Sequence, residues 1–246
     1  MTSVMRLQRA LARAGVASRR HSEALITAGR VTVNGQPAHV GQSVDPARDE
    51  IRVDGKPIGS APETVWLVLH KPAGVMTTRS DPQGRKTVFD LVDDVPGMTY
   101  VGRLDYLTEG VLILTNDGNA VHALMHPSGE VERTYVAVVT GNAMEAAKHA
   151  RLGVALEDGL VQAVAVAARP LGGGRSEFEV TITEGRKREV RRLCKALGLT
   201  VERLIRVRYG PVELGSLRAG ESRPLTKQER AAIENLVART KPHSTN

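Results

Sequence analysis

The chain has 246 residues, enough for one large domain or for a medium domain with a small one. Its net charge of +7 favours a polyanionic partner such as nucleic acid. A single cysteine excludes an internal disulfide and fits a reducing, cytoplasmic setting, and no segment approaches the ~20 apolar residues of a membrane span.

The first 58 residues predict a compact unit of two helices and a small sheet. Leu7 and Leu11 share one helical face, and Gly15 is well placed to end that helix. Ser18 is a typical N-cap for the second helix, and Asn34-Gly35 is a strong hairpin-turn signal. The expected helices are 5–14 and 19–28, and the expected strands are 31–33, near 44, and 51–53.

Arginines cluster on these two helices. An ordinary solvated helix surface remains an alternative, but the clustering favours a phosphate-binding face. The arginines on the helices are Arg6, Arg9, Arg13, Arg19 and Arg20, and Arg30 follows directly after the second helix.

A second, larger domain is expected at residues 65–240, after a linker at 59–64 that is rich in Gly, Pro and Ser. Residues 241–246 are expected to form a flexible tail. Strand patterns recur at 65–69, 111–114, 135–139, 161–167, 178–182 and 204–207, and helical patterns at 118–125, 143–152, 187–197 and 226–237. The mixture predicts an α+β fold built on an extended mixed, mostly antiparallel sheet with flanking helices.

One carboxylate in this domain has an unusual setting. Asp105 is followed by a turn and the apolar run 111–114, which places it at the mouth of a buried strand, and Arg103 precedes it by two residues. A carboxylate can act as a nucleophile, a general base or a metal ligand. Paired-carboxylate chemistry needs a second acid, but Glu109 is interpreted as a turn residue and Asp117 as a helix cap. Asp105 would therefore work alone.

Two other patterns also have simpler interpretations. His122 and His126 have a metal-ligand spacing, but no third ligand is evident, so they are interpreted as structural or RNA-facing and no metal site is expected. The helix at 187–197 combines an apolar stripe with a basic one. It is either an ordinary amphipathic surface helix or a source of cations for Asp105.

Separate motifs, in order along nearly the whole chain, resemble those of known families. Residues 6–20 and 28–35 resemble an S4-type RNA-binding domain, which implies recognition of structured RNA. Residues 102–105 with 108–118 resemble the catalytic signature of the ribosomal RNA pseudouridine synthases, and 184–193 resemble their later basic motif. Further matches lie at 70–75, 81–85, 87–90, 130–135 and 203–210.

Two positions refine this resemblance. Leu107 is apolar where the family usually has a polar residue. Arg188 stands where the small-subunit branch usually has histidine, so the similarity is greater to the large-subunit branch.

The resemblance implies a cofactor-free conversion of uridine to pseudouridine with flipping of the target base. Asp105 matches the catalytic aspartate, which acts on the sugar by attack or by proton abstraction, and Arg191 matches the arginine that pairs with it. Tyr135 matches the tyrosine that stacks on the target base and helps remove its C5 proton. Arg103 matches the residue that fills the gap left by the flipped base. The other RNA contacts implied in this domain are Lys71, Arg186, Arg188 and Arg192.

The implied partner is large-subunit ribosomal RNA or an assembly intermediate that contains it, bound by a monomer. Small-subunit ribosomal RNA and tRNA remain alternative substrates. A non-catalytic S4-type assembly factor and a nucleoside or glycoside hydrolase are the rival functions. The first leaves Asp105 unexplained, and the second needs another carboxylate.

Overall fold

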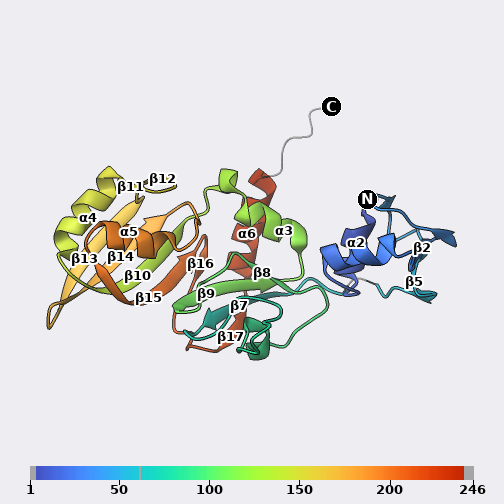
Figure 1. Ribbon diagram of the computed structural model, residues 1–246, viewed down its shortest axis with the longest axis horizontal. Helices are drawn as coiled ribbons and strands as arrows, with labels where there is room; N and C mark the ends of the chain where they lie inside the picture. The colour runs from blue at the N-terminus through green and yellow to red at the C-terminus, as the bar shows by residue number, and fades with distance from the viewer. Residues whose placement is uncertain (1–3, 61, 241–246) are drawn as a thin grey trace. The chain divides into compact units, whose positions relative to one another are not determined.

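The computed structural model of the protein describes residues 4–60 and 62–240, so the tail predicted at 241–246 lies outside the described residues. The chain divides into two compact units (Figure 1). One comprises Met1–Val65 with Asp93–Thr99 and Thr115–Gly118, and the other comprises the remaining segments. Each unit is considered by itself.

The N-terminal unit packs α1 (Leu7–Arg13) and α2 (Arg19–Thr27) against short strands. The side chain of Ser18 accepts a hydrogen bond from the backbone N–H of His21 at 3.2 Å, which confirms the predicted cap. One sheet has the order β3 (Gln36–Pro37), β2 (Val31–Val33), β5 (Ile51–Val53) and β6 (Lys56–Pro57), and β1 (Met5–Arg6) pairs with β4 (Ser43–Val44). The apolar core of the N-terminal unit includes Leu7, Leu11, Ile26, Val31, Val44 and Ile51.

The larger unit is built on one mixed sheet. Its order is β13 (Ala165–Gly172), β14 (Arg175–Ile182), β10 (Arg133–Thr140), β15 (Thr200–Tyr209), β9 (Thr108–Thr115), β7 (Trp66–Lys71) and β17 (Ser222–Pro224). The short strands β8 (Thr99–Val101) and β16 (Val212–Glu213) pair with β9 and β15. Strand β15 runs parallel to β9 but antiparallel to β10, so it joins the two halves of the sheet.

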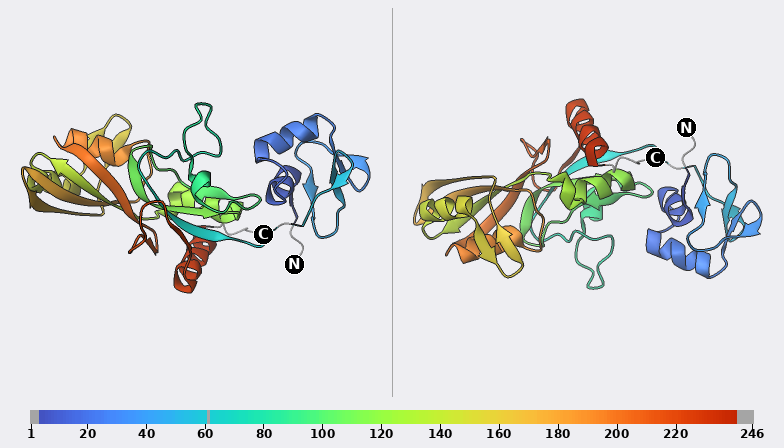
Figure 2. Two further views of the ribbon diagram at one scale, coloured as in Figure 1. Left: turned by 90° about the horizontal axis from the view of Figure 1, so that it is seen from below. Right: turned by 90° about the horizontal axis from the view of Figure 1, so that it is seen from above.

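Helices cover both faces of this sheet. Helix α6 (Lys227–Thr240) lies on one side, and α5 (Glu189–Ala196) lies on the other (Figure 2). Helices α3 (Gly118–Met125) and α4 (Ala143–Leu152) complete the unit, with 3₁₀ segments at Val88–Leu91 and Pro127–Gly129. A core of Trp66, Val68, Val111, Ile113, Leu124 and Ile233 joins β7 and β9 to α3 and α6. Because β9 is buried along most of its length, its N-terminal end is a rigid support for the residues that precede it.

The junction of β9 with β15 requires glycine at position 110. Gly110 has a φ of 111°, and a Cβ atom there would lie 2.1 Å from the carbonyl oxygen of Arg206. No other residue permits this approach of two backbones. The junction lies five residues after Asp105 in the sequence.

Most predicted elements are confirmed, and two of the predicted helices have the same bounds as α3 and α4. The single strand predicted at 161–167 is wrong. Residues Val154–Leu156 (β11) and Gly159–Val161 (β12) form a separate hairpin, and β13 begins only at Ala165. Among the residues that the structure describes, every helix is too short or too polar to span a bilayer.

Candidate functional site

Asp105 lies in the tight turn that leads into β9. Leu104, directly before it, and Thr108, three residues after it, are buried, whereas Asp105 is partly exposed. The backbone N–H of Thr108 donates to the Asp105 carbonyl at 3.0 Å, and the hydroxyl of Thr77 donates to the Leu104 carbonyl at 2.9 Å. The flanking backbone is therefore fixed, and a carboxylate is held at the edge of the core, as the sequence predicts.

A buried lysine binds this turn from the inside. Lys71, at the end of β7, is fully buried, and its ammonium donates to the carbonyls of Pro72 at 2.9 Å, Tyr106 at 3.3 Å and Thr108 at 2.9 Å. Burial lowers the pKa of Lys71 to about 8, although the carboxylates of Glu109 and Asp105 oppose that shift. A side chain without exposed surface cannot contact RNA in this conformation. The expectation that Lys71 binds RNA is therefore corrected: its position in a buried strand makes it a support for the Asp105 turn.

Helix α5 brings a second cation to the same turn. One terminal nitrogen of Arg191 donates to the Leu107 carbonyl at 2.9 Å, and its Nε is buried without a partner among the described residues. Burial lowers the pKa of Arg191, repulsion from Arg188 adds to that shift, and the charge of Asp105 opposes it. Asp105 and Arg191 are thus electrostatically coupled, but the hydrogen bond of Arg191 goes to the backbone of Leu107. A direct pairing of the two side chains stays a prediction.

Glu109 belongs to β9 and is not a turn residue, so that interpretation of the sequence is wrong. Its two carboxylate oxygens accept from Nε and a terminal nitrogen of Arg203 at 2.8 and 2.9 Å. This hydrogen-bonded pair lowers the pKa of Glu109. Glu109 is therefore ionised and paired with Arg203, which makes it a poor proton donor for a paired-carboxylate mechanism.

Tyr135 lies in the middle of the sheet, in register with the β9 junction. The pairing aligns Tyr135 on β10 with Arg206 on β15, and Arg206 with Gly110 on β9. Tyr135 and Arg206 are both buried, and Nε of Arg206 donates to the Val111 carbonyl at 2.9 Å. Arg206 is a structural cation that the sequence did not reveal, because its partner, the Val111 carbonyl, lies 95 positions away on another strand.

The basic residues around α5 divide into two kinds. Arg186 donates to the carbonyls of Asp158 and Leu160, and Arg192 donates to the Asp158 carboxylate at 2.7 Å, so both hold the β11–β12 hairpin. Arg103 and Arg188 are exposed. Arg188 has a left-handed backbone, with a φ of 53°, at the N-cap of α5. These two arginines are available to an external ligand, whereas Arg186 and Arg192 already have acidic or carbonyl partners.

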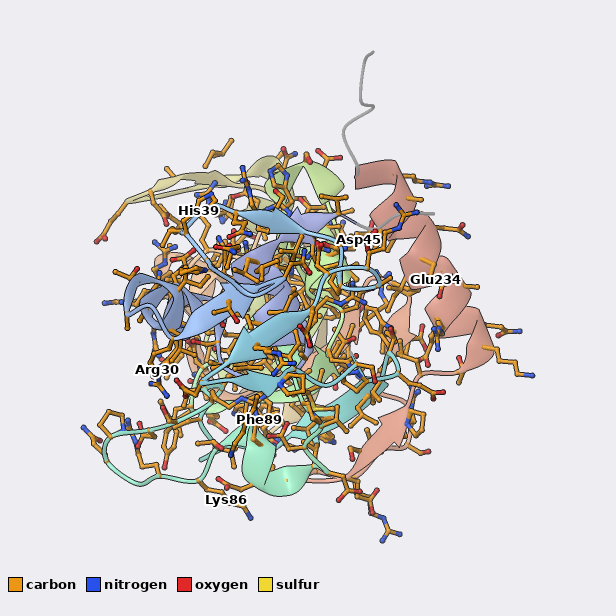
Figure 3. The ribbon with its side chains drawn as sticks, turned by 90° about the vertical axis from the view of Figure 1, so that its right-hand side faces the viewer. Arg30, His39, Asp45, Lys86, Phe89 and Glu234 are labelled. Carbon is orange, nitrogen blue, oxygen red and sulfur yellow. The ribbon has the colours of Figure 1, made fainter. Side chains whose placement is uncertain are left out.

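The N-terminal unit has its own concentration of charge. Burial lowers the pKa of Arg9, and repulsion from Arg13 and Arg19 lowers it further, so these three cations lie close enough to interact. Arg20 is exposed, and Arg6 donates to the Gly41 carbonyl. Arg30, at the periphery of this unit in Figure 3, donates through Nε to Asp54 at 2.8 Å.

No group of three or more potential metal ligands is found among residues 4–60 and 62–240. The rings of His122 and His126 lie 5.7 Å apart between centroids, as neighbours on α3. What the site presents is one partly exposed carboxylate on a turn that two cations bind.

Comparisons with known proteins match both units. The family described as RNA pseudouridylate synthase matches residues 65–196, and the S4 domain matches residues 5–51. An uncharacterized RNA pseudouridine synthase of Mycobacterium leprae is 44% identical over 92% of this chain and 90% of its own length. The ribosomal large subunit pseudouridine synthase B of Vibrio cholerae is 45% identical over 85% of this chain and 67% of its own. The crystal structure of a pseudouridylate synthase matches with a TM-score of 0.63, at 28% identity, over 93% of this chain and 99% of that one.

Proposed function

The chain belongs to the RNA pseudouridylate synthase family, and on that premise we propose that it converts uridine to pseudouridine in large-subunit ribosomal RNA. The N1–C1′ bond of the target nucleotide breaks, the base turns, and C5 bonds to the same C1′. The proton leaves C5 and N1 gains one, so the product is an isomer and no oxidant, reductant or cofactor is consumed. The similarity to the large-subunit synthase of Vibrio cholerae supports this choice of RNA.

Asp105 is the proposed catalytic residue, acting on the sugar of the target nucleotide. The observation that carries this assignment is its setting: the turn that holds Asp105 is bound through backbone carbonyls by Lys71 and Arg191. Neighbouring cations favour the charged form of a carboxylate that loses solvent when RNA binds. Since Glu109 is engaged by Arg203, this arrangement favours a lone-carboxylate isomerase over a glycoside hydrolase.

The remaining roles follow the family motifs. We assign Arg191 to hold the charge of Asp105. Tyr135, which unlike Lys71 keeps 9% of its surface exposed, is assigned to stack on the target base and assist loss of its C5 proton. Arg103 is exposed two residues before Asp105, so it can enter the space that the flipped nucleotide leaves. Arg188 is assigned to contact RNA beside the site.

The N-terminal residues 1–58 are proposed to bind structured ribosomal RNA through the arginines of α1 and α2. We further propose that the protein acts as a cytoplasmic monomer on large-subunit RNA or on an assembly intermediate. A basic surface that binds phosphates without base contacts raises affinity but does not choose the uridine. The choice then falls to the catalytic unit.

The test is release of tritium from ribosomal RNA labelled at uridine C5, with wild type and Asp105→Asn side by side. We expect release by wild type from large-subunit RNA, little from small-subunit RNA or tRNA, and none by Asp105→Asn, which still binds RNA. Release by Asp105→Asn would remove the aspartate from its role. Tight binding without release by wild type would favour the assembly-factor function.

A further inference from the structure

Two large exposed side chains follow the catalytic carboxylate. Tyr106 is 42% exposed and Leu107 is 60% exposed, and both belong to the turn between Asp105 and β9. Single exposed apolar residues are common on protein surfaces. Two in succession, directly beside a catalytic group, form an apolar surface where a substrate must approach.

The backbone of this turn is bound inward while its side chains face outward. The carbonyl of Tyr106 accepts from the backbone N–H of Gly74 at 2.8 Å and from Lys71 at 3.3 Å. The carbonyl of Leu107 accepts from Arg191 at 2.9 Å. Because both carbonyls are satisfied by buried or partly buried donors, the turn has little freedom to fold its side chains into the core.

An arginine accompanies the tyrosine ring. The guanidinium carbon of Arg85 lies 6.0 Å from the centroid of the Tyr106 ring. Arg85 is held by a two-point pair with Asp81, through Nε at 3.0 Å and a terminal nitrogen at 2.7 Å. Lys86, exposed next to it, projects away from the ribbon (Figure 3). The loop that contains Arg85 and Lys86 extends from the same side of the sheet as α5 (Figure 2).

The exposed Tyr106 ring lies near Arg85, which is paired with Asp81, and Lys86 is exposed next to Arg85. An aromatic ring beside such cations has the chemistry that recognises single-stranded nucleic acid. Unstacked bases stack on tyrosine faces, and arginine and lysine meet the adjacent phosphates. Flipping of one nucleotide leaves the neighbouring bases without a stacking partner. Tyr106 and Leu107 lie next to the carboxylate that receives the flipped nucleotide, so a neighbouring base is the group that can reach them.

We propose that Tyr106 and Leu107 form a contact surface for an unstacked base adjacent to the target uridine. The ring of Tyr106 stacks on that base, and Leu107 packs against its edge or sugar. This inference rests on the proposed function and deepens it, since the contact would help decide which uridines are accepted. An apolar Leu107 then alters selectivity relative to family members with a polar residue there.

The test is a coupling experiment between protein and RNA. A large-subunit RNA fragment that wild type modifies is prepared with single abasic nucleotides at each position flanking the target. Wild type, Tyr106→Leu and Tyr106→Phe are compared on each RNA for kcat and KM. Their Kd values are measured with the same changes in an Asp105→Asn background, in which no turnover occurs. Base–aromatic stacking predicts a loss of about tenfold in kcat/KM for Tyr106→Leu on the intact RNA, recovered largely by Tyr106→Phe.

The decisive result is the position dependence. If Tyr106 stacks on one base, removing that base lowers wild-type activity and abolishes the difference between wild type and Tyr106→Leu at that position alone. An equal penalty for Tyr106→Leu on every RNA, or no penalty at all, would overturn the proposal. Leu107→Ala is compared with Leu152→Ala, a leucine of α4 that is 78% exposed, and only the former should lower kcat/KM.

Failure of the proposed function gives a different pattern. Wild type would then bind the RNA without releasing tritium. No target position can then be defined for the abasic series, so that outcome rejects the proposed function and this contact together, whereas tritium release with an unchanged Tyr106→Leu rejects the contact alone.

Discussion

The ammonium of Lys71 and the carbonyl oxygen of Thr108 lie 2.9 Å apart, which joins the last residue of β7 to the first residue of β9 through a fully buried cation. The same ammonium binds the Tyr106 carbonyl within the turn. We therefore propose that Lys71 is a positioning residue for Asp105 and acts through the backbone. A displacement of about 1 Å at a reacting group can cost about a hundredfold in rate.

Replacement of Lys71 by methionine tests this positioning. Methionine has a similar length but no donor, so the carbonyls of Pro72 and Thr108 lose the Lys71 ammonium and that of Tyr106 keeps only the Gly74 N–H. We expect kcat to fall by about tenfold to a hundredfold with little change in KM, because the RNA surface is untouched. Steady-state kinetics and circular dichroism check this, and a rise in KM at constant kcat would instead assign Lys71 to RNA binding.

The pKa of Lys71 gives a pH signature. Burial lowers that pKa from 10.5 to about 8. The carboxylates of Glu109 and Asp105 oppose this shift, and repulsion from Arg206 adds to it. Above pH 8 the folded protein loses a proton that the unfolded chain keeps, so the free energy of unfolding should rise between pH 8 and about 10.5. The full shift corresponds to about 3 kcal/mol.

Activity should change in the opposite direction over the same range. Loss of the Lys71 charge weakens its bonds to the turn, so kcat should decline above pH 8 in wild type. In Lys71→Met this decline and the rise in stability should both be absent. Denaturant unfolding and single-turnover rates at pH 7 to 10 provide the comparison, and an identical profile in both proteins would exclude Lys71 as the titrating group.

Gly110→Ala should disrupt the junction of the two half-sheets. The new Cβ would lie 2.1 Å from the Arg206 carbonyl oxygen, and the φ of 111° is itself unfavourable for alanine. Gly172→Ala is the matched control, because it has a φ of 84° but nothing within 4 Å of the added atom. We expect a loss of about 3 kcal/mol or more in unfolding free energy at Gly110 and about 1 kcal/mol at Gly172. Equal losses of unfolding free energy in the two variants would show that backbone strain, and not the contact with Arg206, accounts for the destabilisation.

The sequence predicted those parts of the fold that depend on local patterns. The buried strand after Asp105, the Ser18 cap and the helices α3 and α4 follow from apolar periodicity and turn chemistry, which act within a few residues. The parallel pairing of β15 with β9 depends on residues about 95 positions apart, so a local pattern could not reveal it.

The same distinction applies to the site. Asp105 could be singled out as the candidate carboxylate because its setting is local. The roles of Lys71, Glu109 and Arg192 could not, since each depends on a partner supplied by another strand or hairpin. A basic residue in an RNA-binding motif was expected to face RNA, yet Lys71 is in the core. Its position directly after an apolar strand was the signal available.

Arg188 and Arg192 should therefore differ in their effect on RNA binding. Arg188 is exposed, whereas Arg192 donates to Asp158 at 2.7 Å. We expect Arg188→Gln to weaken RNA binding and to reduce the slope of log K against log salt by about one, as for a lost phosphate contact. Arg192→Gln should leave that slope unchanged. Filter binding at several salt concentrations distinguishes them, and equal slopes for the two variants would contradict this division.

The arginines of α1 and α2 provide the corresponding test of the N-terminal unit. Arg13 and Arg19 interact repulsively with Arg9, so a bound phosphate would relieve a cost that the free protein carries. The double variant Arg13→Gln and Arg19→Gln should weaken binding to large-subunit RNA and lower the salt slope by about two. Arg30→Gln is the control, because Arg30 already has Asp54 as a hydrogen-bonded partner and is not expected to change the slope. If the double variant bound with the affinity and salt dependence of wild type, RNA recognition would have to lie in the catalytic unit.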